Sequence, residues 1–525
     1  MEKREIGVQK GVPLNQSFDP DTSNTILSNK QNNGFYGRRN IVINANIEEF
    51  LENPLEVLND NLHYILAQHR INVEEMNYLK SFQKGEHDIL KKTRANGEIK
   101  INNKHITNYA WEFVNFKKGY YIGKPIKYVD TSEEETADIK YLLRYVKDVK
   151  KHSKDLIKYE NMLITGLAHT MTIPKRKSFD SEFESPFEYI VLDNENVCVV
   201  KSNDIYNTKL FSMCFSKVKK EDKVVDVYTI YYDNVCLQVE NDGSYLYLIN
   251  TTTMPIRDCI TEYQFNEQRM GVFEPVINSI NTLNVITSNQ LDQLEENVNS
   301  YLTFENVDAE GLLEHIEEFR AKRILVVETN NPETPAKIGS IKVDLEQSSI
   351  NKKYEEIEQR MYDIVGVPMP TSSTGQGVSG EAQVYGGGWE NAQIIALVDT
   401  QYIVQYEEED LKKFIFASQD IASSKTSNLI PTSIEIKYTI NKSNNMMVKA
   451  QSMTYFIDKG FTREQALTYC EITDDPQSDG KIADENYINQ KKLDNELELE
   501  KQKAQKELNE QYSNQEENQL KKEVE

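Results

Sequence analysis

The chain has 525 residues, of which 38% are apolar and 27% charged, so it can bury a sizeable core, and its length predicts about two to four domains. Its net charge of −24 argues against a protein that grips nucleic acid through a broad basic surface. The five cysteines have no C-x-x-C spacing, which predicts neither a zinc site nor a disulfide framework and fits a reducing compartment. No stretch of about 18 uncharged apolar residues and no secretory signal occur, so we expect a soluble protein made inside the cell, with no membrane partner.

The first half of the chain changes from polar to helical and then to strand patterning. Residues 1–40 are rich in Asn, Ser, Gly and Asp and are expected to form a mobile arm. From about 46 to 165 the pattern is mostly helical, with a turn and an extended segment after a short helix in 108–128 and a further helical run over about 136–171. Between 186 and 260 the period changes to two, which predicts an antiparallel sheet.

Two amphipathic helices are predicted in the second half, over 275–302 and 350–367. They enclose a compact unit with a helix over 310–323 and strands over 324–329 and 338–345. Two helices that end in a compact insert would make a stalk with a tip. The alternative is an ordinary helical hairpin in a globular core.

The back faces of both helices are expected to be polar and uncharged, which would suit packing against neighbouring copies. Residues Asn281, Asn284 and Asn289 of the first helix would serve either hydrogen bonds between subunits or solvation, and the sequence favours neither. Beyond the helices, the pattern predicts a helical run from Trp389 to about Ala417 and, after it, a strand over 433–440 and a helical pair.

The segment "GQGVSG" (375–380) matches the dinucleotide-binding pattern G-x-G-x-x-G by its letters. That site needs a strand before the glycines and an acid that closes the next strand. Here a helical segment precedes the glycines, Pro368 and Pro370 intervene, and the acid at about the right distance, Asp399, lies in a helical run. We therefore do not expect nucleotide binding.

Other catalytic and metal-binding motifs are also missing from the sequence. There is no P-loop, no H-x-x-x-H pair suited to zinc and no G-x-S-x-G elbow. The segment "DPQSDG" (475–480) begins like a calcium loop, but its twelfth position is Asn486 and not Glu. We expect no cofactor, no metal and no enzymatic activity.

The composition around the glycines is unusual. From Met361 to Leu411 there is no Lys or Arg, and 371–388 carries one charge, Glu381. Such a segment can hydrogen-bond but cannot neutralise phosphates, so its contact with nucleic acid would be weak and hardly dependent on salt. It is either an ordinary flexible surface loop or a mobile loop facing something that slides past it.

Three segments resemble the portal proteins of tailed bacteriophages, in the branch related to the portal of Bacillus phage SPP1. "NNKHITNYAWEFVNFKKGYYIGKPIKY" (102–128) and "YLKSFQKGEHDILKK" (78–92) are similar to two of that family's segments. "RMYDIVGVPMPTSSTGQGVSGEAQVY" (360–385) is similar to its helix, G-x-P, polar loop and S-G-x-A. The positions that match this third pattern are Gly366, Pro368, Ser379, Gly380 and Ala382. The family usually continues with a Lys/Arg-rich helix, which this chain lacks.

The resemblance implies an α+β portal fold with a mainly helical wing and antiparallel β elements, assembled into a ring. The implied parts are a mobile arm (1–40), wing (41–266), stem helix 1 (267–302), clip (303–347), stem helix 2 (348–366), tunnel loop (367–388), a following helix and crown (389–487) and a charged tail (488–525), expected to be disordered or a solvated helix.

The resemblance also implies a structural role in the virion. About twelve copies would form a channel at one capsid vertex, through which a terminase motor packages double-stranded DNA and through which the DNA is later ejected. Partners would be the terminase large subunit, scaffolding and major capsid proteins and a head–tail connector, and the chain would be made in the bacterial host cytoplasm. The expected DNA-facing residues are Thr371, Ser372, Ser373, Thr374, Gly375, Gln376, Gly377, Val378, Ser379, Gly380 and Glu381.

Two lysines of the clip, Lys337 and Lys342, are candidate contacts for terminase or connector, or else ordinary solvated strand residues. The alternative for the whole chain is a non-viral helical adaptor whose glycine-rich loop and charged tail bind protein partners. Such an adaptor would be a monomer or dimer and would form no ring.

Overall fold

The computed structural model describes residues 12–13, 37–93, 101–131, 138–175, 184–220, 223–241, 243, 245–298, 301–305, 337–341, 347–369, 388–419, 426, 429–440, 446–470, 472–473 and 476–523. The chain divides into two compact units. Unit 1 contains Met1–Ile126 and Asp130–Ile440, and unit 2 contains Lys127–Val129 and Asn441–Glu525. Each unit is described by itself below.

The N-terminal part of unit 1 is helical, as its periodicity predicts. Its helices are α2 (Ile47–Glu52), α3 (Pro54–Gln83), η1 (Asp88–Lys91), α4 (Tyr109–Ile122), α5 (Asp138–Asp148) and α6 (Lys151–Thr165). The helical run expected to reach 171 ends earlier, because strand β4 begins at Leu167. The cause is Gly166, whose φ of +80° ends α6 and where an added side-chain carbon would lie 2.2 Å from the carbonyl oxygen of Arg269.

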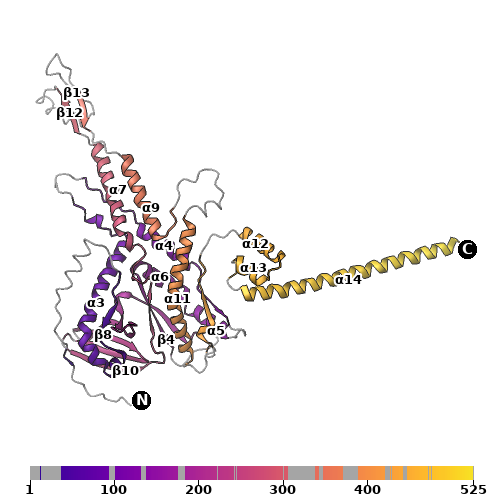
Figure 1. Ribbon diagram of the computed structural model, residues 1–525, viewed down its shortest axis with the longest axis horizontal. Helices are drawn as coiled ribbons and strands as arrows, with labels where there is room; N and C mark the ends of the chain where they lie inside the picture. Colours follow the sequence, from indigo (N-terminus) through magenta and orange to yellow (C-terminus); the bar gives the residue numbers. More distant parts are fainter. Residues whose placement is uncertain are drawn as a thin grey trace. The chain divides into compact units, whose positions relative to one another are not determined.

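Two sheets follow, and their antiparallel pairing over the predicted region is confirmed. The seven-stranded sheet has the order β1 (Val12–Pro13), β10 (Tyr245–Thr253), β9 (Val235–Asn241), β8 (Lys223–Tyr232), β7 (Lys209–Lys220), β6 (Val197–Ser202) and β2 (Ile41–Ile43). The three-stranded sheet has the order β11 (Ile260–Gln264), β4 (Leu167–Pro174) and β5 (Phe187–Leu192), and a short η2 (Asn194–Asn196) follows β5. The apolar stripe of α3 packs with Phe211 and Ile230 of the large sheet, beside which Figure 1 shows this helix.

The last residues of the expected N-terminal arm, 37–40, belong to the folded body, so the predicted boundary at residue 40 lies too far along the chain. Arg38 is only 2% exposed, and its guanidinium pairs with Glu274 and, at 3.2 Å, with Glu75. A buried arginine is stable only when it is paired in this way. The next residues lead directly into β2, which lies parallel to β6 and was not predicted.

Two helices of unit 1 lie side by side and lead to a two-stranded ribbon (Figure 1). They are α7 (Ile277–Val298), which follows η3 (Glu274–Val276), and α9 (Gln347–Val365). The ribbon pairs β12 (Tyr301–Glu305) with β13 (Lys337–Ile341) in antiparallel register. The first helix is therefore shorter than its predicted range, because Tyr301 begins a strand that pairs with Ile341. The helix and strand predicted over 310–329 lie outside the described residues.

Unit 1 ends with α11 (Trp389–Gln419), η4 (Pro431–Ser433) and β14 (Ile434–Lys437). Strand β3 (Lys127–Asp130) belongs to unit 2 except for its last residue, Asp130, which belongs to unit 1. Unit 2 contains α12 (Met446–Asp458), α13 (Arg463–Cys470) and α14 (Pro476–Glu523). Of the two alternatives for the charged tail, the structure shows the solvated helix, since every residue from Asp484 to Glu507 is exposed. None of the helices in the described ranges is both long and apolar enough to cross a bilayer.

Candidate functional site

The two residues that flank the glycine-rich segment, Pro368 before it and Gly388 after it, lie next to each other. The expected DNA-facing residues 371–381 lie outside the described residues, but both ends of the segment are described. A side-chain carbon added at Gly388, on the returning end, would lie 3.8 Å from the Cα of Pro368, on the outgoing end. The segment is therefore a closed excursion from the body rather than a connection between distant parts.

The outgoing end is fixed by a glycine cap on α9. The N–H groups of Gly366 and Val367 both donate to the carbonyl of Tyr362, at 2.9 and 3.1 Å, and Gly366 has a φ of +68°. An added side-chain carbon at this glycine would lie 2.3 Å from Cδ1 of Ile395 on α11. A side chain here would be strained by the left-handed backbone and would also push the end of the Ile395 side chain aside, so the position favours glycine.

The returning end begins with a second left-handed glycine. Gly388 has a φ of +80°, and its carbonyl accepts the N–H of Ala392 at 3.0 Å in the first turn of α11. The next residue, Trp389, packs its ring against Phe116 and Tyr120 of α4, with centroid distances of 5.7 and 6.2 Å. The indole therefore anchors the end of the segment to α4.

Helix α4 also holds the outgoing helix α9. The hydroxyl of Tyr109 donates to Glu358 at 2.6 Å, and the hydroxyl of Tyr362 donates to Glu112 at 2.8 Å. The ring of Tyr362 stands edge-on to Phe113 at 5.1 Å. Burial, together with the Glu112 carboxylate, raises the pKa of Tyr362, so this phenol stays a hydrogen-bond donor.

A buried ion pair joins α4 to α11. The Lys117 ammonium lies 3.3 Å from the carboxylate of Asp399, to which the hydroxyl of Tyr121 donates at 2.5 Å. Burial lowers the pKa of Lys117, and the charge of Asp399 opposes that shift. One helix thus contacts the helix on each side of the glycine-rich segment: its first half holds α9 and its second half holds α11.

Further along, α11 is locked into the core by buried charges. Glu407 pairs with Lys151 at 2.9 Å and also with Lys158, and both lysines pair with Asp155. Burial alone would raise the pKa of Glu407, but the two ammonium groups outweigh it and lower this pKa to about 2. The carboxylate is therefore ionised at neutral pH, and α11 is fixed to α6.

One turn further on, Asp410 accepts hydrogen bonds from three hydroxyls of the three-stranded sheet. Those of Thr261 and Tyr263 lie at 2.6 Å and that of Thr170 at 3.1 Å. The side chains of α11 thus bond to both α6 and the sheet. These bonds leave the helix little freedom to slide.

The polar face of α7 is covered by the same chain. The N–H groups of Asn103, His105 and Thr107 donate to Asp292, Ser288 and Asn284, at 2.6, 2.9 and 3.0 Å. Asn281 and Asn289 bond to Asp88 and Lys92, at 3.0 and 2.8 Å. These bonds lie within one chain; Asn284 is buried by them, whereas Asn289 remains exposed, which agrees with the solvation alternative for that residue.

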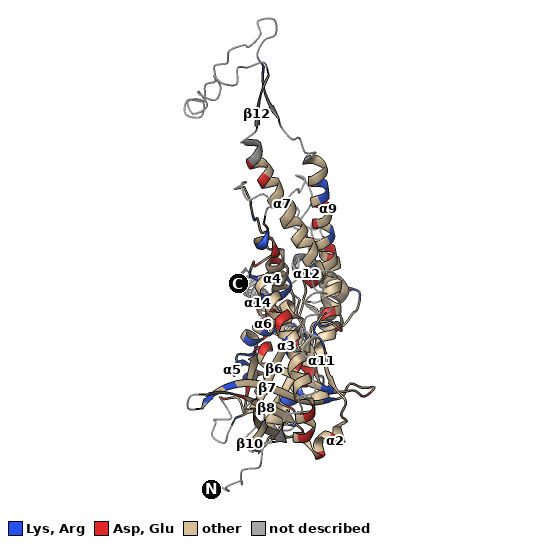
Figure 2. Cartoon of the chain, turned by 90° about the vertical axis from the view of Figure 1, so that its left-hand side faces the viewer, with Lys and Arg blue, Asp and Glu red and all other residues tan. Residues whose placement is uncertain are grey.

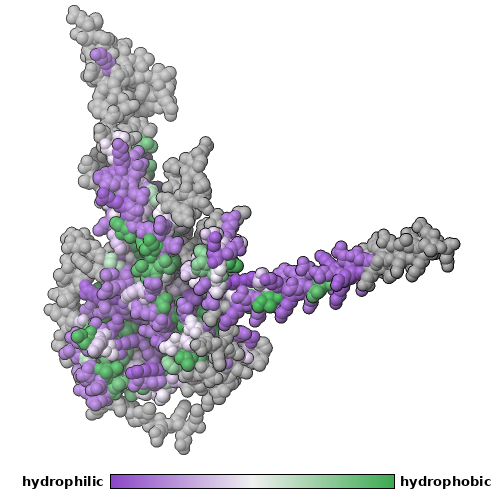
Figure 3. All heavy atoms as spheres, turned by 45° about the vertical axis from the view of Figure 1, so that its right-hand side comes forward, coloured by the Kyte–Doolittle hydropathy of each residue, from purple (hydrophilic) through white to green (hydrophobic). Residues whose placement is uncertain are grey.

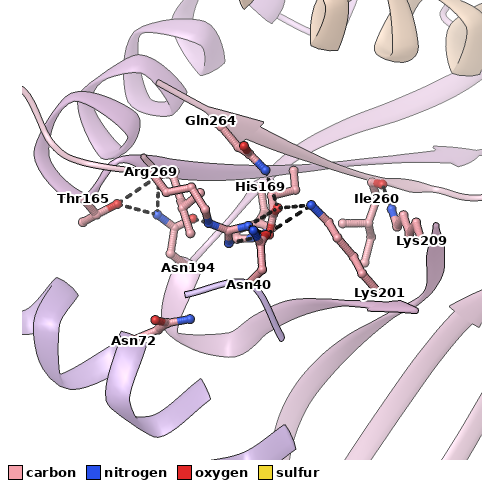
Figure 4. A network of polar contacts seen from close by, with 12 residues as sticks. Asn40, Asn72, Thr165, His169, Asn194, Lys201, Lys209, Ile260, Gln264 and Arg269 are labelled. Carbon is pink, nitrogen blue, oxygen red and sulfur yellow. Dashed lines mark hydrogen bonds and ion pairs between the residues drawn. The ribbon is translucent and has the colours of Figure 1, made fainter. Parts of the chain in front are cut away.

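A second buried network joins β4, β6 and β11 to the segment before η3 (Figure 4). Arg269 (φ +59°) forms a bidentate pair with Glu262 at 2.9 and 3.1 Å, and Lys201 lies 3.9 Å from the same carboxylate. His169 lies 2.9 Å from Asn194. Burial opposes ionisation of Glu262, but Arg269 and its neighbours hold the pKa of that carboxyl well below its usual range. Glu262 therefore pairs with Arg269 and Lys201 inside the fold.

The clip lysines can be placed only in part. Lys337 is exposed at the start of β13, where its register partner is Glu305, and Lys342 lies outside the described residues. Figure 2 shows Lys and Arg interspersed with Asp and Glu on α9, whose exposed face is therefore charged. In the ranges that the structure describes, no three His, Cys, Asp or Glu side chains are grouped to hold a metal ion.

The role of α4 could not be predicted from the sequence. Its segment carries the family resemblance, but no local pattern links Lys117 to Asp399. The available signal was the position of Lys117, four residues after Phe113 and four before Tyr121, which places it on the aromatic face of the helix, where a lysine needs a carboxylate partner. Which carboxylate it meets is a tertiary fact.

Comparison with known proteins supplies the class of protein. Residues 62–386 match the family model described as "Phage portal protein, SPP1 Gp6-like", which covers more than half of the chain. The chain is thus a phage portal protein by family, which confirms the resemblance read from its sequence. Within that class it belongs to the SPP1 Gp6-like family.

Other comparisons are weaker. A solved structure described as "Neck of empty GTA particle computed with C6 symmetry" is 11% identical, covers 70% of this chain and 90% of that chain, and has a TM-score of 0.37. A search of curated proteins gives no match.

Proposed function

We propose that this chain forms a ring of about twelve copies at one capsid vertex and that double-stranded DNA passes through the centre of the ring, inward during packaging and outward during ejection. Membership of the portal family supports this, and the family is structural rather than enzymatic. The adaptor alternative has no comparable support. The observation that carries the proposal is the closed excursion 370–387, whose two ends meet at Pro368 and Gly388.

The proposed working part is this excursion, with residues 371–381 facing the DNA. Both ends of the segment are anchored, because α4 holds α9 and α11 while Glu407 and Asp410 fix α11 to the core. The absence of Lys and Arg from 361 to 411 keeps phosphate contacts weak. A net charge of −24 per copy adds repulsion, so DNA would pass in both directions without sticking.

The remaining partners follow from the same proposal. The ribbon of β12 and β13 with the segment between them would be the clip, which docks the terminase large subunit and later the head–tail connector, with Lys337 and Lys342 as contacts. Scaffolding and major capsid proteins would bind the wing. The chain would be made in the bacterial host cytoplasm and end in the virion.

Electron microscopy of the purified protein tests the ring. Top views with a central hole, and a copy number near twelve after symmetry averaging, are the expected result. Monomers at every concentration, with or without scaffolding protein, would contradict the proposal and favour the adaptor.

A loop replacement then tests the channel element. Because the ends of the excursion meet, residues 371–387 can be replaced by two or three glycines while Gly388 is kept as the first carbonyl acceptor of α11. Rings should remain, whereas DNA packaging or retention should be lost. A control replaces 371–387 with a Gly/Ser segment of the same length, and normal packaging by both variants would show that the loop does not act on DNA.

A further inference from the structure

The seven-stranded sheet of unit 1 has the N-terminal part of the chain at both of its edges. Strand β2 lies at one edge, beside β6, and β1 lies at the other, beside β10. The two edges are covered to different extents. β2 pairs at three positions with a strand of six residues. β1 pairs at only two positions, Val12 with Leu246 and Pro13 with Tyr245, on a strand of nine residues.

The outer edge of β10 is therefore open over most of its second half. Within the described ranges, no strand pairs with the outer side of Leu248–Thr253. The side chains from Ile249 to Thr253 are exposed, and Figures 1 and 2 both show β10 at the margin of unit 1.

An open edge binds differently from a surface patch. On the face of unit 1 that Figure 3 shows, hydrophobic side chains gather in small groups among hydrophilic ones. A strand edge instead offers backbone N–H and C=O groups in a row, which bind any extended segment that lies beside them. The question is therefore which extended segment covers the outer side of β10.

The pairing of β1 directs the residues before it along this open edge. In an antiparallel pair, residues before Val12 run beside the residues after Leu246. Eleven residues precede Val12, and they lie outside the described part of the chain. Thr253, which ends β10, is seven positions after Leu246, so the segment before Val12 is long enough to reach it.

The sequence of this segment has the pattern of an edge strand. In "IGVQKGVP" (6–13), Ile6, Val8 and Val12 stand at alternate positions, with Gly or Gln between them. A period of two with β-branched residues favours a strand that is buried on one face. The remaining alternate position is Lys10, and lysine is typical of edge strands.

Pro13 determines which backbone groups would face β10. A proline has no N–H, so Pro13 cannot stand at a hydrogen-bonded position of the antiparallel pair. Such positions alternate along a strand, so the hydrogen-bonded pair is Val12 with Leu246. If the strand continues before Val12, its even-numbered residues turn their N–H groups towards β10, and its odd-numbered residues turn theirs away.

We propose that residues 6–13 form one continuous edge strand on β10 of the same chain, with the even-numbered residues facing it, and that this strand closes the sheet to other chains. The occupant is the chain's own N-terminal segment, because β1 already places that segment at the start of the open edge and in the right direction. Its covalent connection gives it a high effective concentration there, so a strand from another molecule would have to displace it.

Two proline variants of the full chain test the strand. Val8→Pro removes an N–H that faces β10, so the amides of Leu248–Thr253 that point outward should exchange hydrogen roughly tenfold or more faster. Gln9→Pro is the matched control, because its N–H points away from β10, and exchange should stay as in the wild type. Amides of β9, which pairs on both sides, are the internal reference.

The comparison of the two variants decides the outcome. Equal exchange of the β10 amides in Val8→Pro and Gln9→Pro would overturn the proposal, because only a paired strand distinguishes even from odd positions. Wild-type edge amides that already exchange as fast as in Val8→Pro would overturn it too.

Cysteine cross-linking shows whose segment lies on the edge. Val8→Cys with Asn250→Cys, treated with a short bis-maleimide, should give a link within one chain, identified by the mass of the joined peptides. Asn250→Cys alone is the control for reaction with the natural cysteines. Links found only between two chains would mean that a second copy supplies the strand, and that result would overturn the proposal, as would the absence of any link between the two positions.

Discussion

The ammonium of Lys117 lies 3.3 Å from the carboxylate of Asp399, and this contact joins α4 to the helix that follows the glycine-rich segment. Asp399 is the acid that a dinucleotide site would have used to bind a ribose. In the structure it is occupied by Lys117 and by the hydroxyl of Tyr121. Asp399, the acid that would complete the G-x-G-x-x-G site, therefore has a structural role.

We expect Asp399→Ala to lower the free energy of unfolding by about 3–5 kcal/mol, because it leaves the buried Lys117 ammonium unpaired. The double variant Lys117→Met/Asp399→Ala should recover most of that loss, since no buried charge remains. Urea titration followed by circular dichroism measures both values. A single-variant cost below about 1 kcal/mol would show that Lys117 reaches water.

The two glycines at the ends of the segment should differ in their tolerance of a side chain. Gly366→Ala should cost more than the roughly 1–2 kcal/mol of left-handed backbone strain, because its methyl group would also meet Ile395 at 2.3 Å. Gly388→Ala should cost that strain only, because the nearest atom is 3.8 Å away. Melting temperatures compare them, and Ile395→Val should partly restore Gly366→Ala. Equal losses for the two would argue against the close approach of α9 and α11.

The buried Glu407 should contribute to acid sensitivity. Its pKa is lowered from 4.5 to about 2, so in this range the unfolded chain binds more protons than the folded one. The stabilisation is present above pH 4.5 and is lost as the pH falls towards 2; it amounts to about 3 kcal/mol at about 1.4 kcal/mol per pKa unit.

The variant Glu407→Gln is expected to be less stable at pH 7, because Lys151 and Lys158 lose their shared partner. Its stability should also fall less steeply than that of the wild type between pH 4.5 and 2. Unfolding titrations across that range measure the difference, and parallel curves for the two proteins would exclude Glu407 as the group responsible.

Asparagine substitutions on α7 should separate internal support from surface solvation. Asn284 is buried and accepts the N–H of Thr107, so Asn284→Ala should cost about 1–3 kcal/mol for the unpaired donor. Asn289 is exposed, and Asn289→Ala should change stability by less than about 0.5 kcal/mol. Ring assembly should survive both. If Asn284→Ala abolished the ring without changing the unfolding curve, that result would favour the hypothesis that Asn284 bonds to a neighbouring subunit.

Much of the fold could be predicted because local patterns decide it. The apolar spacing along α3, α9 and α11 and the period of two over 186–260 report which face of each element is buried, and burial is the main driving force. Errors occurred where a long-range contact overrides the local pattern. Tyr301 continues a helical stripe in the sequence, but it pairs with Ile341 across a ribbon.

The family could be recognised from segments 78–92, 102–128 and 360–385 alone, and the order of elements around the glycines argues against a nucleotide site. What the polar residues do depends on tertiary packing. Asn284 turns to Thr107, Lys117 to Asp399 and Glu407 to two lysines of α6. The physical reason is that a polar side chain must be satisfied once it is buried, while its partner is selected by how distant segments pack and not by any local spacing.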